Sequence, residues 1–248
     1  MISTTRQLAL LGIVAMLFSC NEHTVRKEGY RVHGIDVSHY QKHIDWPTVA
    51  GQGIHFVFAK ATEGATLQDS LFCRNWSEIQ AVGLKRGAYH FFRPATDAVR
   101  QARNFLATVP PEDGDLAPVL DVEVVDGVDA ETLREGMRTW LREVETVYMV
   151  KPIIYSNQKF FNNYLAGHFH DYPIWIARYS AWRKPCLKAG HVWDFWQYGN
   201  RGRLAGIDGD VDLNVFRGSV AALENHTIKR PAPLFAPAVV EDAFAANP

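Results

Sequence analysis

The order of secondary-structure patterns along the middle of the chain restricts the possible folds more than any other feature of the sequence. Each of the first five of eight short β-like runs is followed by a helical stretch, and the last three runs follow one another without helices. This order predicts an α/β protein with a single incomplete TIM-like (β/α)5β3 barrel. An open doubly wound sheet fits the first half, but it accommodates the last three strands less well. The predicted strands are Val32–Asp36, His55–Lys60, Gly87–Phe92, Ala117–Glu123, Pro152–Ser156, Ile174–Tyr179, Val192–Tyr198 and Asp210–Asn214.

Three amphipathic patterns predict the main helices. Apolar residues recur at helical spacing over Asp69–Val82, Thr96–Val109 and Asp129–Val150. Shorter helical turns are expected after Pro47 and after Asn157. Residues 180–191 and 199–209 are instead rich in Gly, Arg, Lys and Trp, so we predict loops there.

Two acids lie two residues apart at the end of the fourth predicted strand. Side chains at i and i+2 of a strand share a face, so Asp121 and Glu123 are expected to project together. Adjacent carboxyl groups raise each other's pKa, so one can stay protonated while the other is charged, as a glycosidase requires. Asp36 and Asp212 lie near the ends of the first and last strands, so we expect all four acids in one cleft at the C-terminal strand ends. For an isolated Asp-x-Glu, a solvated pair at a strand end is the structural alternative.

Composition excludes several classes of function. The chain has 26 Lys+Arg against 27 Asp+Glu and no basic stripe, so no nucleic-acid partner is predicted. It contains no C-x-x-C or H-E-x-x-H, and His168-x-His170 alone is a weak signal, so neither a metal nor a cofactor is predicted. The 7 Trp, 9 Tyr and 14 Phe could provide platforms for sugar rings, although most are expected in the core. A monomer is expected.

The two ends of the chain are predicted to lie outside the barrel. Residues 1–19 resemble a lipoprotein signal peptide, because the apolar run Leu8–Phe18 is too short to span a bilayer and ends in the lipobox-like residues Leu17-Phe18-Ser19-Cys20. Acylation of Cys20 would anchor the protein in the cell envelope, with the outer membrane favoured because no Asp follows the cysteine. An ordinary secretory signal is the alternative.

The remaining boundaries follow from composition. Residues 20–31 are predicted to be a tether, 32–223 the barrel, and 224–248 a Pro/Ala-rich disordered tail. An oxidising envelope permits a disulfide between Cys73 and Cys186, and buried free thiols are the alternative.

A set of motifs in the same order along the chain resembles glycoside hydrolase family 25, the Chalaropsis-type lysozymes. The set is specific because its members span residues 33 to 217 collinearly, although each alone is weak. The motifs are HGIDVSHYQ at 33–41, FAKATEG at 58–64, GAYHFF at 87–92, LDVE at 120–123, IYSN at 154–157, IWIARY at 174–179, FWQY at 195–198 and GIDGDVDLN at 206–214.

The resemblance implies a (β/α)5β3 barrel that hydrolyses the β-1,4 bond between N-acetylmuramic acid and N-acetylglucosamine in peptidoglycan. By position, Glu123 would be the general acid, and Asp121 would either attack the anomeric carbon or orient the substrate acetamido group. Asp36 and Asp212 would bind the sugar and tune the central pair; structurally, Asp36 could instead cap a turn and Asp212 could pair with an arginine. The residues at matching strand ends are candidate sugar contacts: Tyr89, Tyr155, Trp175, Tyr179 and Gln197.

Two alternatives to an active muramidase remain open from the sequence. One is a glycan-binding lipoprotein of the same fold without turnover, which the four intact acids disfavour. The other is a glycosidase that acts on another N-acetylated glycan, such as chitin.

Overall fold

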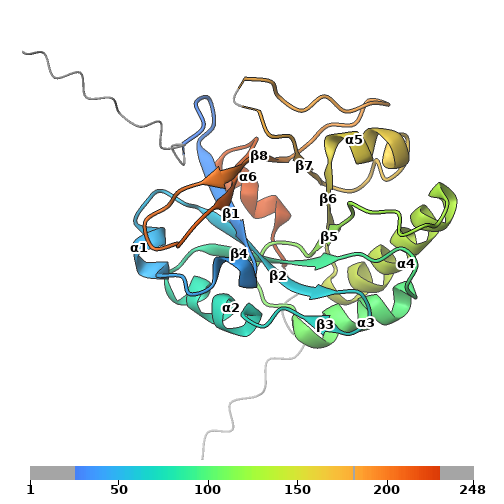
Figure 1. Ribbon diagram of the computed structural model, residues 1–248, viewed down its shortest axis with the longest axis horizontal. Helices are drawn as coiled ribbons and strands as arrows, with labels where there is room; N and C mark the ends of the chain where they lie inside the picture. The colour runs from blue at the N-terminus through green and yellow to red at the C-terminus, as the bar shows by residue number, and fades with distance from the viewer. Residues whose placement is uncertain (1–25, 181, 230–248) are drawn as a thin grey trace, which may run out of the picture.

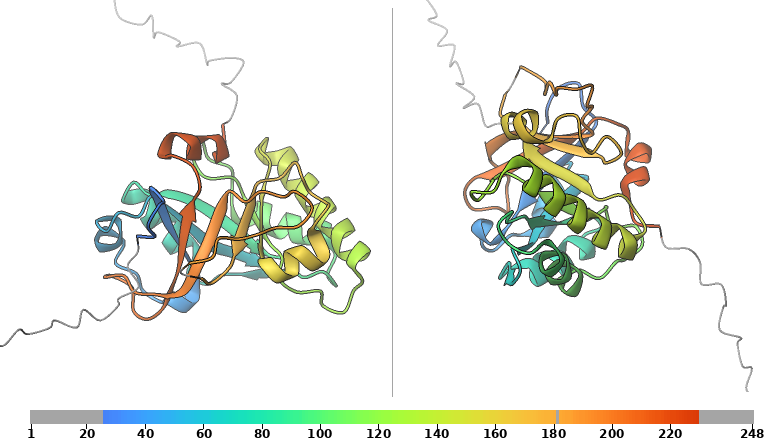
Figure 2. Two further views of the ribbon diagram at one scale, coloured as in Figure 1. Left: turned by 90° about the horizontal axis from the view of Figure 1, so that it is seen from above. Right: turned by 90° about the vertical axis from the view of Figure 1, so that its right-hand side faces the viewer.

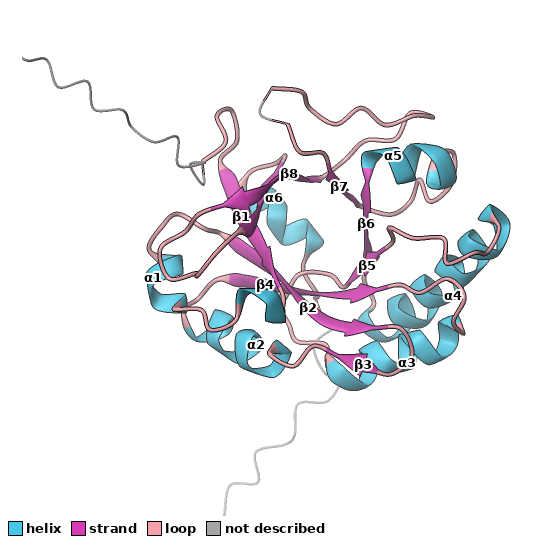
Figure 3. Cartoon of the chain, viewed as in Figure 1, coloured by secondary structure: helices cyan, strands magenta, loops and turns pink. Residues whose placement is uncertain are grey.

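The computed structural model describes residues 26–180 and 182–229, in which eight strands close into a barrel (Figures 1 and 3). Around the barrel the strand order is β1-β9-β8-β7-β6-β5-β4-β2, and pairing of β2 with β1 closes the ring. The short β3 adds to the outer side of β2. The strands are β1 (Val32–Val37), β2 (Phe56–Glu63), β3 (Leu67–Gln68), β4 (Lys85–Phe91), β5 (Val119–Asp121), β6 (Ile153–Asn157), β7 (Ile174–Ala177), β8 (Phe195–Gly202) and β9 (Val211–Phe216).

Helices follow the early strands and are absent between β7, β8 and β9 in the described part of the chain, which confirms the predicted (β/α)5β3 plan. The long helix α4 buries one apolar stripe that includes Met137 and Trp140, and the Asp129 side chain caps its first turn. In Figures 1 and 2, α2, α3 and α4 cover one side of the barrel. The helices are α1 (Trp46–Ala50), α2 (Phe72–Ala81), α3 (Ala98–Thr108), α4 (Ala130–Tyr148), α5 (Gln158–Phe160), which continues as a π-helical turn (Phe161–Leu165), and α6 (Val220–Leu223).

Strand β9 runs opposite to the other barrel strands. It is antiparallel to both β1 and β8, whereas the remaining barrel pairings are parallel. The reason is the short β8–β9 connection, because a parallel pair needs a longer crossover. The prediction that Asp212 lies at the C-terminal end of its strand is therefore wrong: it is the second residue of β9. Reversal of the strand nevertheless brings it to the same mouth, where it pairs in register with Asp36.

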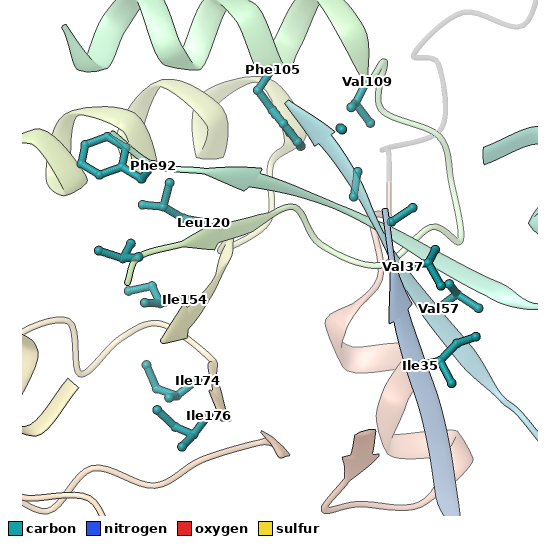
Figure 4. Close-up of a cluster of buried hydrophobic side chains, with 14 of the residues drawn as sticks. Ile35, Val37, Val57, Phe92, Phe105, Val109, Leu120, Ile154, Ile174 and Ile176 are labelled. Carbon is teal, nitrogen blue, oxygen red and sulfur yellow. The ribbon is translucent and has the colours of Figure 1, made fainter. Parts of the chain in front are cut away.

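Two apolar layers support that mouth. One layer lies between the strands and the helices, where Phe92, Leu120 and Ile154 pack (Figure 4). The other fills the barrel interior, where the rings of Phe56, Phe58 and Phe195 meet edge to face at centroid distances of 5.5 Å. The interior is too tight for added atoms, because a Cβ at Gly34 would lie 2.4 Å from the Phe56 ring. The barrel interior is thus filled with side chains, and a ligand can bind only to the side chains at the mouth.

The packed domain extends past both predicted boundaries. Within the predicted tether, Tyr30 packs against Trp193 and Trp196, with ring centroids 6.2 and 6.0 Å apart. Beyond residue 223, Ala117 N–H donates to the His226 carbonyl and Ile228 N–H to the Asp115 carbonyl. These hydrogen bonds join the segment after residue 223 to the barrel, and amino-acid composition alone does not reveal them. The predicted signal peptide, Cys20 and residues 230–248 lie outside the described residues.

Two further observations concern the envelope predictions. Cys73 and Cys186 are both free and exposed, so neither the disulfide nor the buried thiols are found. Within residues 26–180 and 182–229, no helix combines the length and the apolar character needed to cross a bilayer.

Candidate active site

Polar side chains form a ring on top of the packed interior at the C-terminal ends of the parallel strands. Because side chains alternate along a strand, the inward position above Phe58 is Lys60, the one above Val119 is Asp121, and the one above Phe195 is Gln197. The ring and the loops above it line a cavity of about 260 Å³. Its lining residues are Asp36, Val37, Ser38, Tyr40, Gln41, Lys60, Tyr89, Phe91, Asp121, Glu123, Tyr155, Trp175, Tyr179, Gln197 and Asp212.

Asp36 and Asp212 share a hydrogen bond across the β1–β9 seam. Burial raises the pKa of Asp36 to about 6, although hydrogen bonds from Asn214, Gln197 and Asp212 oppose this shift. Burial, and then the negative charge of Asp36, raise the pKa of Asp212 to about 9. Near neutral pH, Asp212 therefore keeps its proton and donates a hydrogen bond to the Asp36 carboxylate. The structural alternative for Asp212, an ion pair with Arg201, Arg203 or Arg217, is not found among the described residues. Arg203 pairs with Asp210 and Arg217 with Asp194 instead.

A chain of donors from the adjacent strands β9 and β8 converges on Asp36. Gln197 Nε2 and Asn214 Nδ2 donate to Asp36 Oδ2 at 2.8 and 2.7 Å. The hydroxyls of Tyr155 and Tyr179 donate to Gln197 Oε1 at 2.8 and 3.1 Å. Each amide thus has its orientation set by a donor behind it, so the Asp36 carboxylate is held in one position.

Trp175 mainly supports the polar side chains at the mouth, and little of its surface faces the cavity. Its indole Nε1–H donates to Asn214 Oδ1 at 2.8 Å, and its ring stacks on Phe58 with centroids 4.5 Å apart. The side chain is almost completely buried. Most of the ring surface is therefore in contact with protein, although the residue lines the cavity.

Asp121 and Glu123 occupy the opposite side of the mouth. Strand β5 ends at Asp121, so Glu123 projects from the following loop and not from the strand as predicted, yet both line the same cavity. Burial, and then the nearby charge of Glu123, raise the pKa of Asp121 well above its usual value. Burial likewise raises the pKa of Glu123, and side-chain hydrogen bonds with Asn157 and Tyr155 partly oppose it. In both carboxyl groups, burial therefore favours the protonated form.

One side-chain oxygen of Asp121 has no hydrogen-bond partner among the described residues. Asp121 Oδ1 is buried and accepts no hydrogen bond from the part of the chain that the structure describes. An unsatisfied buried acceptor is costly, so such atoms are rare and tend to mark functional positions.

Lys60 is a cavity residue that was not predicted from the sequence. It is the only Lys or Arg among the described residues that line the cavity, and its Nζ donates to Glu63 Oε2 at 2.7 Å. Its charge lowers the pKa of Asp121 and so opposes the effects of burial and of Glu123. The alternation Phe56, Phe58, Lys60 in the second predicted strand would have placed it at the mouth.

All of the predicted cleft residues line this one cavity: Asp36, Asp121, Glu123, Asp212, Tyr89, Tyr155, Trp175, Tyr179 and Gln197. Tyr89 lines the cavity with the acids, and burial together with the charges of Asp36, Asp121 and Asp212 raises the pKa of Tyr89 well above its usual value. A larger cavity of about 500 Å³ lies beside the starts of β6, β7 and β8 and the turn Glu224–His226. Tyr172, His191 and His226 are among its lining residues, and none of the four acids is.

A closed α/β barrel with a cluster of carboxyl groups across its C-terminal mouth is the arrangement of a carboxyl-dependent glycoside hydrolase. The model of the glycosyl hydrolases family 25 matches residues 35–207. The chain belongs to this family and is a glycoside hydrolase.

Individual relatives agree with this assignment. The chain is 47% identical over 200 residues to the uncharacterized protein YegX of Escherichia coli (strain K12), covering 79% of this chain and 73% of YegX. It is 36% identical over 213 residues to Lysozyme M1 of Streptomyces globisporus, covering 79% of this chain and 72% of that protein. A family 25 glycosyl hydrolase structure from Bacillus anthracis superimposes with a TM-score of 0.76 at 33% identity, over 81% of this chain and 95% of that one.

Proposed function

We propose that this protein is a peptidoglycan muramidase that hydrolyses the β-1,4 bond between N-acetylmuramic acid and N-acetylglucosamine. The observation that carries the proposal is the cluster of Asp36, Asp121, Glu123 and Asp212 in one cavity of a family 25 barrel. Relatives named as lysozyme or N,O-diacetylmuramidase support the choice of glycan. Peptidoglycan strands would be its partner, and no cofactor is needed for this chemistry.

Glu123 is the general acid in this proposal. A carboxyl group must hold its proton near neutral pH to protonate the leaving oxygen, and burial raises the pKa of Glu123 in that direction. The side chain of Asn157 has its own orientation set, because Asn157 Oδ1 accepts the Phe160 N–H at 2.9 Å at the start of α5. The hydrogen bond between Asn157 and Glu123 then holds the acid in a constant direction.

Asp121 is the partner of Glu123, and it stabilises positive charge at the anomeric carbon. In one mechanism Asp121 attacks the anomeric carbon directly. In the other it accepts a hydrogen bond from the N–H of the substrate acetamido group, and the carbonyl oxygen of that group attacks the anomeric carbon. The unpartnered Asp121 Oδ1 suits the second role, because a buried acceptor gains a donor when the acetamido group arrives. Lys60 supports either role, since its charge lowers the pKa of Asp121 and so favours the ionised form.

Asp36 and Asp212 act together as a fixed acceptor and donor for the sugar. The donors behind Asp36 hold its carboxylate in place, and the shared proton removes one negative charge from the cleft. Tyr89, Tyr155, Tyr179 and Gln197 complete the lining and contact the sugar in this proposal. Trp175 contributes mainly by orienting Asn214.

Product analysis tests the proposed bond. Purified peptidoglycan is digested with residues 21–248, the products are reduced with borohydride, and the new ends are identified by mass spectrometry. Reduced muramic acid at the new ends is the expected result, and Glu123→Gln should lower turnover by roughly 10²- to 10⁴-fold, the typical contribution of a positioned acid. Reduced glucosamine ends would overturn the bond specificity while keeping the glycosidase class.

Two other functions give different results in the same assay. A glycan-binding lipoprotein would retain peptidoglycan without releasing products, and Glu123→Gln would leave that retention intact. A chitinase-like glycosidase would cleave chitin oligomers as fast as peptidoglycan. The intact acids and the raised pKa of Glu123 favour turnover over binding alone.

We further propose that the enzyme is a monomer held in the cell envelope through acylated Cys20, with residues 1–19 removed and the outer membrane favoured. The support is the apolar run and lipobox-like sequence before Cys20. Labelling of cells with a fatty-acid analogue tests it. The wild-type protein should incorporate label and sediment with membranes, whereas Cys20→Ser should do neither. Equal labelling of both proteins would refute acylation at this cysteine.

A further inference from the structure

An exposed aromatic ring stands at the rim of the cleft in a position that the proposed chemistry does not use. Tyr40 lines the same cavity as the four acids, yet 76% of its surface is exposed. It lies in the short 3-10 turn His39–Gln41, which follows directly after β1 and Asp36. A large exposed aromatic side chain carries an unfavourable hydration cost that a ligand can relieve.

The ring is supported from below by a second ring. The His39 imidazole lies under Tyr40 with centroids 4.2 Å apart and an interplanar angle of 33°. His39 is held in turn by Asp69, whose Oδ2 contacts His39 Nδ1 at 2.6 Å and accepts the His39 backbone N–H at 3.0 Å. The Asp69 side chain is 1% exposed. Support of this kind lets one face of Tyr40 stay open while the other is packed.

The backbone of the turn is held as firmly as the ring. Ser38 Oγ accepts the Tyr40 N–H at 3.3 Å, and Gln41 Oε1 accepts the Ser38 N–H at 2.9 Å, which together form a capping box. Gln41 Nε2 also donates to the Asp210 carbonyl at 3.1 Å and so ties the turn to the loop before β9. A group that is already ordered loses little entropy when it binds a ligand.

From these contacts we propose that Tyr40, carried on the His39–Asp69 pair, is the platform of a separate sugar-binding subsite at the rim. The ligand is the apolar C–H face of an N-acetylated pyranose ring in the glycan strand that occupies the cleft. This inference rests on the proposed function, because it assumes that the cleft holds a glycan. Tyr40 contacts a ring outside the reacting bond, so it determines how long a strand the enzyme prefers and not the rate of bond cleavage.

Binding of glycan oligomers of defined length tests the platform. In a Glu123→Gln background, affinities for peptidoglycan oligomers of two, four and six sugars are measured by calorimetry with and without Tyr40→Ala. We expect Tyr40→Ala to weaken binding of the longest oligomer by about three- to tenfold, the range of one aromatic contact, and to affect the disaccharide less. Tyr40→Phe keeps the ring and should keep the affinity.

Two more variants separate the platform from a general disturbance. Asp69→Asn weakens the support of His39 and should reproduce part of the length-dependent loss, whereas Val147→Ala on the exposed face of α4 should change nothing. On the active enzyme, Tyr40→Ala should raise KM for long strands and leave kcat within about twofold.

The outcomes distinguish this inference from the proposed function. If wild-type enzyme cleaves peptidoglycan but Tyr40→Ala binds every oligomer like its parent, the platform is refuted and the muramidase proposal stands. If length-dependent binding requires Tyr40 but the wild type cleaves nothing, the platform stands and the muramidase proposal fails. Absence of binding at every length refutes the platform, and the muramidase proposal is then decided by whether the wild type cleaves peptidoglycan.

Discussion

Replacement of Asp212 by Asn should stabilise the protein at neutral pH, because the folded state keeps a proton there that the unfolded chain releases. The pKa of Asp212 rises from an ordinary 3.8 to about 9. A carboxyl group with a raised pKa costs no stability below its unfolded pKa. The cost grows through the window between the two values, by about 1.36 kcal/mol for each pH unit.

The window from pH 3.8 to 7 spans about 3 units and sets an upper limit of about 4 kcal/mol. Asp212 is only partly shielded from solvent and shares its proton with Asp36, so we expect about 1–3 kcal/mol. Asn can donate to Asp36 as the protonated acid does, so the hydrogen bond is kept. For a domain of this size, such a gain raises Tm by about 2–12 °C.

Thermal unfolding followed by circular dichroism between pH 4 and pH 8 measures the effect. The gain in Tm should be near zero at pH 4 and should increase steadily towards pH 8. Asp208→Asn is the matched control, because it makes the same change at an exposed position four residues earlier, in the loop before β9. A gain that is absent, or that is equal at all pH values, would show that the raised pKa of Asp212 is not a cost of folding.

Three further predictions concern the other charged groups. Lys60→Met removes the charge that lowers the pKa of Asp121, so the acid limb of the kcat/KM profile should move to higher pH. Lys60→Arg should leave that limb in place, and an unchanged limb in both variants would mean that Asp121 need not ionise. Arg86 donates to both oxygens of Asp115 at 2.8 and 3.1 Å and is 2% exposed, so Arg86→Met should cost about 3–5 kcal/mol and lower Tm by about 6–20 °C. Asp129→Ala removes the cap that accepts two N–H groups at the start of α4 and should cost about 1 kcal/mol in the same unfolding assay, with no change in KM.

The barrel was predictable because its strands and helices carry strong local patterns. The apolar stripe of α4 and the buried runs of β2 and β6 indicate their structures from sequence alone. The strand β8 was predicted over Val192–Tyr198, but it begins at Phe195 and continues to Gly202. Its last residues are held by pairing with β9 and are mostly not buried, so they carry no apolar pattern. The two-residue β3 carries no pattern and depends on pairing with β2.

The cleft residues were predictable where the motif and the strand end coincide, as at Asp36 and Asp121. Their connections were not, because the convergence of Gln197 and Asn214 on one oxygen of Asp36 depends on the closure of the barrel. The direction of β9 also escaped prediction, since a strand looks the same from either end in sequence. Lys60 escaped prediction for a different reason: a lysine side chain that is only 12% exposed is unusual, so a charge at the end of an apolar run predicts the end of a strand and not a cleft residue.

Because β1 and β9 are paired antiparallel at the closure of the barrel, catalytic activity depends directly on whether the barrel is closed. The strand that closes the ring also delivers Asp212 opposite Asp36, so a slip of one residue in this pairing would turn the acid away from the mouth. Any local opening of β9 would separate the two acids and breach the barrel wall in the same event. Loss of activity on heating or in denaturant should therefore follow opening of this seam, ahead of the helices on the far side.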